Sequence, residues 1–362
     1  MVSKLFLPSD SRNACSRDAQ PAPGASSHGY PVASRLGCVA LIFLQCLAWT
    51  GCASNAASRK NTETRAPEPY LRIIREDPGK VSLQIALRRF QPARGYGPDI
   101  WLVGASHVGE SNYYASLQRY LDDRDVVLFE GVGAKNKTEL FDPEDQTSLQ
   151  HTMALALGVV FQLQAIHYDR AHFRNSDLTI PQLQRLLAGR KQNGEPAAGE
   201  ANEEFEQLMQ MMDGSSTLGT LMHFGLKLIG SSRKLQAMTK MMLIEALGGF
   251  RGDMAQMKGI PPAIQQLLIV IIQERNKVVL ADLAAELANR RSGKESSAVF
   301  YGAGHMVDLE KRLRAELKYH PRSEIWLTAL GVDFHAAGLT ASEVDSLRSI
   351  VQWQLDAMQP RE

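Results

Sequence analysis

Hydrophobic and polar positions along the chain are arranged in a way that predicts buried strands connected by helices. Residues 99–104 (DIWLVG) and 126–129 (VVLF) are short, continuous apolar runs, which are typical of strands covered on both faces. Between them, residues 111–121 carry apolar side chains at the helical spacing i, i+3, i+7. The order strand, helix, strand predicts parallel strands joined by a right-handed crossover.

Further elements continue this pattern toward the carboxyl terminus. Strands are expected at residues 81–90, 298–301 and 324–330, and helices at 147–164, 179–190, 264–288 and 307–317. We therefore expect an α/β domain over residues 80–335, with a central, mostly parallel sheet and flanking helices. A C-terminal helix is expected within residues 336–362.

The middle of the chain departs from this alternation of strands and helices. A helical insertion is expected at about residues 147–290, and residues 202–257 within it hold nine of the 13 methionines. A Met-rich helical stretch is typical of adaptable core packing, because the methionine side chain is flexible and polarisable. A mobile cap and a groove for a hydrophobic peptide are the alternative interpretations, and the sequence leaves them open.

The beginning of the chain has the pattern of a targeting signal. Residues 37–49 form an apolar stretch of 13 residues. Such a stretch spans about 20 Å as a helix, which is less than the roughly 30 Å of a membrane core. It is followed by Thr-Gly-Cys-Ala-Ser at residues 50–54, which resembles a bacterial lipobox, where a peptidase cuts before the cysteine and the cysteine is lipidated. An ordinary cleaved signal peptide and an uncleaved anchor are the alternatives.

We therefore expect a lipoprotein signal peptide at residues 1–51 and a lipidated Cys52, with a flexible tether over residues 52–79. Several acyl chains on one cysteine would anchor the protein firmly to a membrane. The residues Ala53-Ser54 after the cysteine favour the outer membrane. The expected location of the body is the bacterial cell envelope, facing the periplasm.

Composition and charge exclude several classes of protein. Hydrophobic residues make up 44% and charged residues 22% of the chain, which is ordinary for a globular protein. The net charge of +1 is too small for a general nucleic-acid scaffold, so we expect no nucleic-acid partner. All four cysteines lie within residues 1–52, which excludes a disulfide-stapled body, a Cys-ligated zinc site and a cysteine nucleophile there.

One short motif occurs twice, each time directly after an expected buried strand. The motif Gly-x-x-His ends at His107 and again at His305, and the expected central strand, 126–129, is followed by Glu130. Ligands of an open parallel sheet bind at the carboxyl ends of its strands. Two imidazoles and a carboxylate form a ligand set for a divalent metal (Mn, Co, Zn or Fe), with positions left for water or substrate. The alternative is that both histidines are satisfied residues in strand-end turns.

Two charged residues are further candidates for this site. Arg275, on the expected long helix before the last motif, could clamp a substrate carboxylate or an oxyanion. An ion pair of Arg275 with Glu130 or Glu274 is equally compatible with the sequence. Glu110 follows His107 by three residues and is a candidate catalytic residue that transfers a proton, as Glu130 is.

A polar cluster between helices is a candidate for substrate binding. It consists of Tyr168, Arg170 and Asn175, and a turn stabilised by Asn and Asp side chains is the alternative interpretation. Ser106 lies beside a motif histidine, but no Gly-x-Ser-x-Gly elbow surrounds it. We therefore reject a serine hydrolase.

These motifs resemble those of the TraB/GumN/Tiki family, which has the erythromycin-esterase/ChaN-like fold. The two Gly-x-x-His motifs of the family fall on His107 and His305, and its glutamate falls on Glu130. An Arg-Asn pair, which the family has on the helix before the second motif, falls on Arg275 and Asn276. The resemblance therefore adds Asn276 to the expected substrate-binding residues.

The resemblance extends over roughly residues 80–335 and is looser at residues 168–170 and 175–179. The Met-rich region differs from the family in length. The resemblance implies metal-dependent peptidase activity, as in the animal members of the family. It also implies a second possibility, because related lipoproteins are thought to bind haem.

Three functions from different classes are compatible with these features. The first is a membrane-anchored, periplasm-facing, metal-dependent hydrolase, in particular a peptidase, which acts on a peptide or small-molecule substrate. The second is a non-catalytic lipoprotein that binds haem or a hydrophobic peptide, and the third is a structural envelope protein with a vestigial site. The paired motifs and the carboxylate favour the hydrolase, because a haem site needs only one or two axial ligands.

Overall fold

The computed structural model describes residues 67–75, 77–94, 96–131, 149–189, 217–249, 267–289 and 296–358. All of these lie within a single unit of residues 42–362. The expected signal peptide and the lipidated Cys52 lie outside the described residues. Within the described ranges, no helix is both long and apolar enough to cross a membrane.

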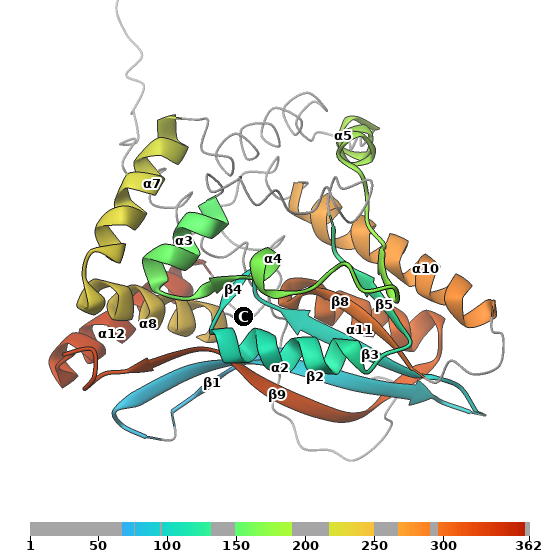
Figure 1. Cartoon of the computed structure of the whole chain (residues 1–362), viewed down its shortest axis with the longest axis horizontal. Coiled ribbons are helices and arrows are strands. Elements are labelled where there is room, and N and C mark those ends of the chain that lie inside the picture. Colours follow the sequence, from blue (N-terminus) through green and yellow to red (C-terminus); the bar gives the residue numbers. More distant parts are fainter. Residues whose placement is uncertain are drawn as a thin grey trace, which may run out of the picture. The chain divides into compact units, whose positions relative to one another are not determined.

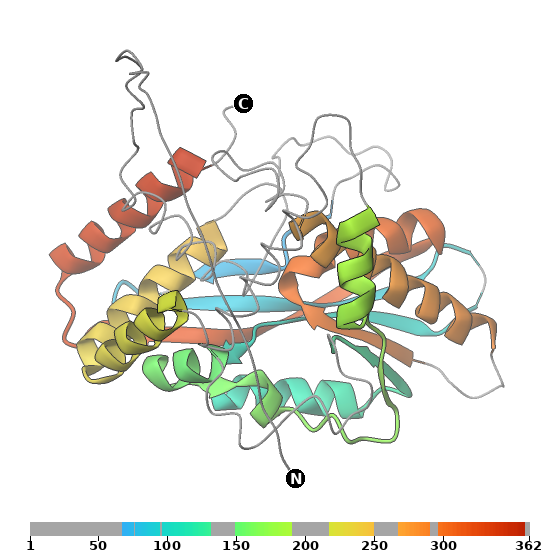
Figure 2. The ribbon, with the colours of Figure 1, turned by 90° about the horizontal axis from the view of Figure 1, so that it is seen from above.

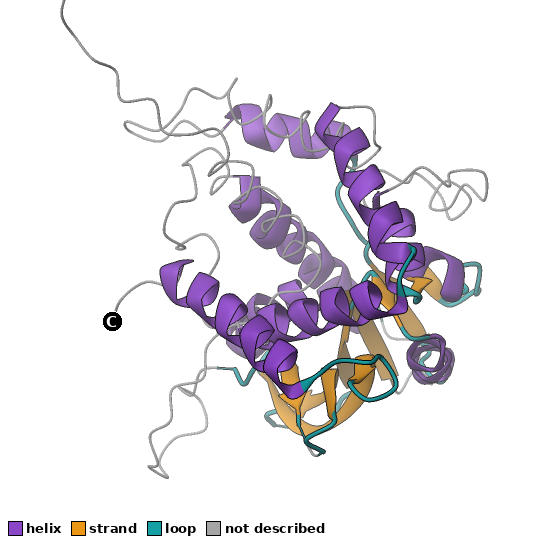
Figure 3. Ribbon diagram, turned by 90° about the vertical axis from the view of Figure 1, so that its left-hand side faces the viewer, coloured by secondary structure: helices purple, strands orange, loops and turns teal. Residues whose placement is uncertain are grey.

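A mixed β-sheet forms the centre of the fold (Figure 1). Four of its strands run parallel in the order β3, β8, β5, β7, and β2 pairs antiparallel with β1, β3 and β9. The strands are β1 (Leu71–Ile74), β2 (Lys80–Pro92), β3 (Asp99–Ala105), β5 (Val126–Phe129), β7 (Phe173–Asn175), β8 (Ser296–Gly302) and β9 (Tyr319–Asp333). Figure 3 shows these strands together with the helices around them. The expected α/β class is confirmed.

Strand β8 lies between β3 and β5, although it comes last of the three in the sequence. Ala298 of β8 is paired in parallel with Trp101 of β3 on one side and with Val127 of β5 on the other. The expectation that residues 126–129 form the central strand is therefore wrong, because β8 separates β5 from β3. The carboxyl ends of all three strands consequently meet at one edge of the sheet.

Helices cover both faces of the sheet, as Figure 2 shows. The helices α2 (Ser111–Asp122), α3 (Leu149–Leu157) and α8 (Arg233–Gly249) contribute to a hydrophobic cluster on one face, and α10 (Arg275–Ala288) and α11 (Met306–Glu316) to a cluster on the other. Leu87 of β2 belongs to the first cluster and Ala86 to the second, as the alternation of side chains along a strand requires. Complete burial of a leucine side chain contributes about 1.5–3 kcal/mol, so these clusters determine which face each strand residue occupies.

The helix expected at residues 147–164 is interrupted. Helix α3 ends at Leu157, and Gly158 has a φ of +64°, a left-handed conformation that glycine adopts without strain and that ends a helix. The chain then forms the short strand β6 (Val160–Phe161), which pairs with β4 (Val108–Gly109), and the single turn α4 (Gln162–Ala165). This interruption brings Gln162 against the backbone of the first Gly-x-x-His motif.

Part of the expected tether belongs to the fold. Strand β1 lies within residues 52–79, and its neighbour Tyr70 is completely buried. The Tyr70 hydroxyl donates to Glu310 of α11 (2.8 Å), and the same Glu310 carboxylate accepts from Arg88 of β2 (2.6 Å). Arg88 also donates to the carbonyl oxygens of residues 68 and 69, and these hydrogen bonds hold the residues before β1 against β2. The expected tether, residues 52–79, therefore extends too far toward the carboxyl terminus, because it includes β1.

The remaining described helices include α5 (Ile180–Gly189), α7 (Thr217–Gly230) and α12 (Ala341–Met358), the last of which confirms the expected C-terminal helix. Of the Met-rich region, α7 and α8 are described, and Met241 of α8 is completely buried in the core. Core packing is therefore confirmed for this methionine. The expected insertion is not wholly helical, because it contains β7, which pairs with β5.

Candidate functional site

The two Gly-x-x-His motifs and Glu130 meet at the carboxyl edge of the parallel strands. His107 follows β3, Glu130 follows β5, and His305 ends a 3₁₀ turn (Ala303–His305) that follows β8. The first glycine of the first motif is required by close packing. A Cβ atom on Gly104 would lie 3.0 Å from the Ile85 side chain and 3.3 Å from a backbone oxygen of β2. The motif therefore keeps the strand end close enough to its neighbours for the site to form.

Glu130 connects three elements through its two carboxylate oxygens. Its Oε2 accepts a hydrogen bond from the backbone N–H of Gly302 (2.7 Å), and its Oε1 accepts from Nη2 of Arg275 (2.6 Å). The same Oε1 lies 3.8 Å from Nε2 of His305. Burial acts to raise the pKa of the Glu130 carboxyl, but the charge of Arg275, the two motif histidines and the Gly302 N–H together hold the pKa well below its usual range. Glu130 is therefore ionised at neutral pH.

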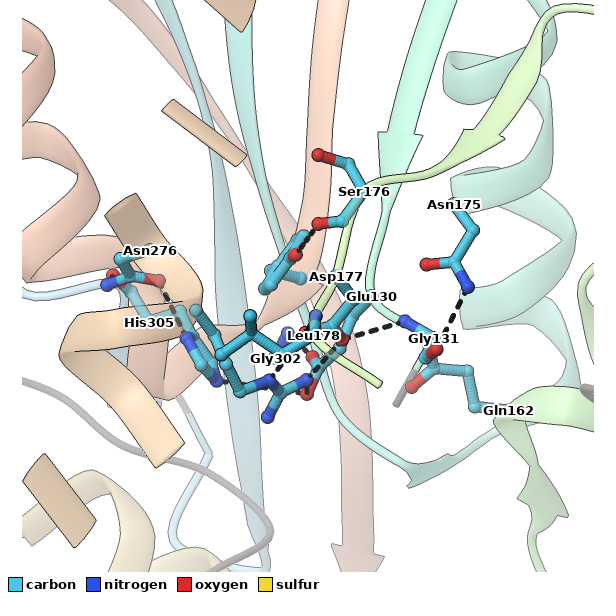
Figure 4. A network of polar contacts seen from close by, with 12 residues as sticks. Glu130, Gly131, Gln162, Asn175, Ser176, Asp177, Leu178, Asn276, Gly302 and His305 are labelled. Atoms are coloured by element: carbon cyan, nitrogen blue, oxygen red, sulfur yellow. Dashed lines mark hydrogen bonds and ion pairs between the residues drawn. The ribbon is translucent and has the colours of Figure 1, made fainter. Parts of the chain in front are cut away.

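Arg275 is held from its other side by Asp177, a residue to which the sequence assigned no role. Nε of Arg275 donates to Oδ1 of Asp177 (2.8 Å) and Nη2 donates to Oδ2 (2.7 Å), which is a bidentate ion pair. Figure 4 shows Asp177 beside Glu130 in this network. Arg275 begins α10 directly after a π-helical turn, Val270–Glu274, in the same continuous helix. Such turns occur frequently at functional sites.

Asn276 orients the ring of His305. Oδ1 of Asn276 lies 2.7 Å from Nδ1 of His305, while Nδ2 of the same amide donates to Asp308 (2.9 Å). Because the amide uses its donor for Asp308, its oxygen accepts from Nδ1–H of His305, and Nε2 keeps its lone pair. Asn276 therefore supports His305, in contrast to the expected contact with substrate.

Both motif histidines are neutral at neutral pH. Burial lowers the pKa of His305 to about 4, although the charge of Glu130 acts in the opposite direction. Burial also lowers the pKa of His107. The charge of Glu130 acts to raise this pKa, and the charge of Arg275 acts to lower it. The centre thus combines two neutral imidazoles with two carboxylates and one guanidinium, which leaves a net charge of −1.

We tested whether these residues fit the expected divalent metal. The donor chemistry fits, because the imidazoles are unprotonated, the carboxylate is ionised, and each carboxylate oxygen has a lone pair beyond its present hydrogen bond. The distance of 3.8 Å between Nε2 of His305 and Oε1 of Glu130 is also close to the roughly 3–4 Å that separates two ligands with bonds of roughly 2.1 Å. Among the described residues, however, no group of three or more His, Cys, Asp or Glu side chains is arranged to hold an ion. The metal therefore stays a prediction.

Tyr168 and Asn175 lie close to this centre, and their contacts are within the protein. Tyr168 is buried, with its hydroxyl 2.8 Å from Nε2 of Gln162 and its ring stacked on Phe300. Asn175 donates through Nδ2 to the carbonyl oxygen of Gly131 (2.9 Å), as Figure 4 shows. Asn175 ends β7, and this hydrogen bond joins β7 to the residue that follows Glu130 after β5, so it stabilises the contact between two strand ends.

Arg170 and Glu110 are not brought into the centre by their described contacts. Arg170 pairs with Asp122 (3.3 Å), which ends α2 at the opposite edge of the sheet from the motif histidines. Glu110 pairs with Lys240 of α8 (3.0 Å). The expected roles of Arg170 in substrate binding and of Glu110 in proton transfer therefore have no support from these contacts.

Two residues that the sequence did not single out belong to the centre. Asp177 lies two residues after β7, whereas Glu130 directly follows β5, and β7 has only three residues, so no strand was expected before Asp177. Gln162 donates from its backbone N–H to the carbonyl oxygen of His107 (2.8 Å). Its side-chain Oε1 is buried and has no hydrogen-bond partner among the described residues. A carboxylate just after a strand was the available signal for Asp177, and no sequence signal exists for Gln162.

Comparison of the chain with family models, with curated proteins and with solved structures gives no match. The resemblance to the TraB/GumN/Tiki family accordingly rests on the motif residues themselves and stays a prediction.

Proposed function

We propose that this protein is a divalent-metal-dependent hydrolase, in particular a peptidase, with His107, Glu130 and His305 as the metal ligands. The observation that carries the proposal is the pair of acceptors formed by Nε2 of His305 and Oε1 of Glu130. They face each other at 3.8 Å, and at neutral pH neither atom carries a proton. A lone pair opposite an anionic oxygen is repulsive, and a cation bound to both atoms would remove this repulsion.

The charge of the centre supports the same proposal. Two carboxylates and one guanidinium leave one negative charge, which a divalent cation would offset. Coordination by Nε2 of His305, with Nδ1–H donated to Asn276, is the usual arrangement of a metal-ligating histidine and its supporting residue. His107, which follows β3, would contribute the second neutral imidazole.

The chain's own residues have separable tasks in such a hydrolase. A bound divalent ion would supply polarisation of the scissile carbonyl and activation of water. Glu130 acts as a ligand, because a carboxylate with so low a pKa is a weak general base. Nη1 of Arg275 donates to no acceptor among the described residues, so it is available to stabilise negative charge that develops on a substrate oxygen.

Hydrolysis of a peptide library tests the proposal. We expect cleavage by the purified protein, its loss after chelation, its return with added Mn²⁺ or Zn²⁺, and its loss in His305→Ala. His167 is an exposed histidine outside the centre, so His167→Ala is the matched control and should cleave like the wild type. Cleavage that survives both chelation and His305→Ala would contradict the proposal.

Binding of an apolar ligand without turnover is the second candidate function. Helix α7, from the Met-rich region, exposes Leu221, Phe224 and Leu228 by 63%, 68% and 58%. These side chains recur at i, i+3 and i+7 and therefore form one apolar stripe. An apolar stripe of this kind suits a hydrophobic peptide.

Haem binding without turnover is tested by the absorption spectrum of the purified protein. We expect no Soret absorption band if the centre binds a hydrolytic metal.

We further propose that the protein is a lipoprotein, anchored in the outer membrane through Cys52 and facing the periplasm. The support is the sequence of residues 37–54, which lies outside the described residues. In this location its peptide substrates would belong to the cell envelope.

A further inference from the structure

Asp177 is the most completely satisfied carboxylate of the centre. Its side chain is 0% exposed. Besides the two hydrogen bonds from Arg275, it accepts from the backbone N–H of Leu178 (2.7 Å) and of Gly131 (3.0 Å). All four contacts are donations to the carboxylate, so Asp177 is a charged acceptor whose position is determined by β7, β5 and α10 together.

The position of Asp177 solves an electrostatic conflict in the proposed metal centre. Arg275 holds Glu130 in place through Oε1, but a guanidinium on a ligand carboxylate neutralises the charge that attracts a cation. Without Asp177, the pair of Glu130 and Arg275 would have no net charge, and a divalent ion would approach an unopposed guanidinium. With Asp177 bound to the other edge of the guanidinium, one negative charge is restored.

We propose that Asp177 is a positioning residue that compensates the charge of Arg275, so that Arg275 can hold Glu130 while the centre still attracts a divalent cation. This inference rests on the proposed function, because it concerns the affinity of the proposed metal ligands. It assigns a role to a residue that touches neither the metal ligands nor the substrate directly and that acts through Arg275.

A second cluster in the same protein provides a matched control. Arg88 is also shared by two carboxylates, those of Glu310 (2.6 Å) and Glu324 (3.0 Å), and its side chain is as buried as that of Arg275. Its ion-pair partners among the described residues include no histidine. Glu310→Gln therefore removes a buried, Arg-bound carboxylate without changing the proposed metal centre. Its effect on metal affinity measures what loss of a buried ion pair does by itself.

The test has two measurements on the full chain. Calorimetric titration with Mn²⁺ gives the affinity for the ion. Titration with Co²⁺, followed by visible absorption, reports which ligands bind it. The variants are Asp177→Asn, Arg275→Gln, the double variant and Glu310→Gln, each checked for folding by near-ultraviolet circular dichroism. We expect Asp177→Asn to weaken binding by about 10-fold or more, in the range typical of residues that support metal ligands. The double variant regains the net charge of the wild type but lacks the hydrogen bond from Arg275 to Glu130, so it should bind more tightly than Asp177→Asn. Glu310→Gln should bind like the wild type.

The outcomes separate this inference from the proposed function. If the wild type binds the ion and Asp177→Asn binds it equally well, the inference is overturned and the metal centre stands. If the double variant binds no better than Asp177→Asn, charge compensation is likewise overturned. If the wild type binds no ion, both proposals fail. If Asp177→Asn does not fold, the comparison of Arg275→Gln with the double variant tests the inference. The double variant, which lacks the charge of Asp177, should bind about 10-fold more weakly than Arg275→Gln, and equal affinity would overturn the inference.

Discussion

Nδ1 of His305 lies 2.7 Å from Oδ1 of Asn276, and this contact determines which ring nitrogen of His305 carries the proton. Asn276 is completely buried, and its Nδ2 already donates a hydrogen bond to Asp308. The amide oxygen therefore accepts from Nδ1–H. Nε2 of His305 is left with its lone pair toward Glu130, as metal coordination requires.

Replacement of Asn276 by alanine should release the His305 ring. We expect the wild type at pH 7 to show a single Nδ1–H tautomer in long-range ¹H–¹⁵N spectra, and Asn276→Ala to show a mixture of tautomers. The loss of the buried hydrogen bonds should lower the free energy of unfolding by about 1–3 kcal/mol. Metal affinity should fall by about 10- to 100-fold. An Nε2–H tautomer in the wild type would contradict this account of Asn276.

The buried histidine predicts how the stability of the metal-free protein depends on pH. His305 has a pKa of about 4 in the folded protein and an ordinary pKa of about 6.5 when unfolded. Between these values the unfolded chain binds more protons, so stability is greatest above pH 6.5 and falls as the pH decreases toward 4. The loss from this residue is about 3 kcal/mol at most. Glu130, whose pKa is depressed, adds a further loss below its ordinary pKa of 4.5.

Chemical denaturation between pH 7 and pH 5 measures this dependence, with His305→Gln as the comparison. The variant should lose less stability over this range than the wild type, and the remaining slope should include His107 and His223, whose pKa values are lowered as well. An unchanged slope in His305→Gln would show that His305 is not buried in its neutral form.

The cluster around Glu310 should be essential for stability and unrelated to metal binding. Glu310 is 1% exposed and accepts from both Arg88 and Tyr70. Glu310→Gln should therefore lower the free energy of unfolding by about 3–5 kcal/mol, because it leaves a buried guanidinium incompletely paired. The matched surface variant is Asp122→Asn, which breaks the half-exposed pair with Arg170 and should cost less than about 1 kcal/mol. Equal losses in urea denaturation would contradict the difference in burial.

The lipoprotein proposal predicts that Cys52→Ser releases the protein from membranes. The described fold begins at residue 67, after this position, so the variant should fold and should appear in the soluble fraction once residues 1–51 are removed. Cys46→Ser lies within the expected signal peptide and is the control, which should remain membrane-bound. A Cys52→Ser protein that is processed and still sediments with membranes would contradict lipidation at this cysteine.

Local pattern was sufficient to predict the strands that carry the motif residues. The runs at 99–104 and 126–129 are apolar throughout because helices cover both faces of the sheet, and this is visible without any knowledge of tertiary contacts. The expectation that His107, Glu130 and His305 lie close together follows from one rule, because parallel strands expose their carboxyl ends at a common edge of the sheet. The order of the strands in the sheet does not follow from local pattern, because the position of β8 between β3 and β5 depends on contacts between residues about 170 to 200 positions apart in the sequence.

The residues that sequence reasoning missed are those placed by short or irregular elements. Asp177 follows a strand of three residues, FRN, which has neither an apolar run nor a clear alternation. Gln162 reaches the first motif only because Gly158 ends α3 in a left-handed conformation. A glycine inside a helical pattern is compatible with both continuation and termination, and here tertiary packing decides between them.

The central claim is that His107, Glu130 and His305 bind a divalent metal ion, and its most direct test is calorimetric titration of the metal-free protein with Mn²⁺ and Zn²⁺. We predict one site per chain in the wild type and in the control His167→Ala, and no specific site in His107→Ala, His305→Ala or Glu130→Gln, all of which should remain folded. Absence of a stoichiometric site in the wild type, or the same affinity in wild type and Glu130→Gln, would contradict the claim.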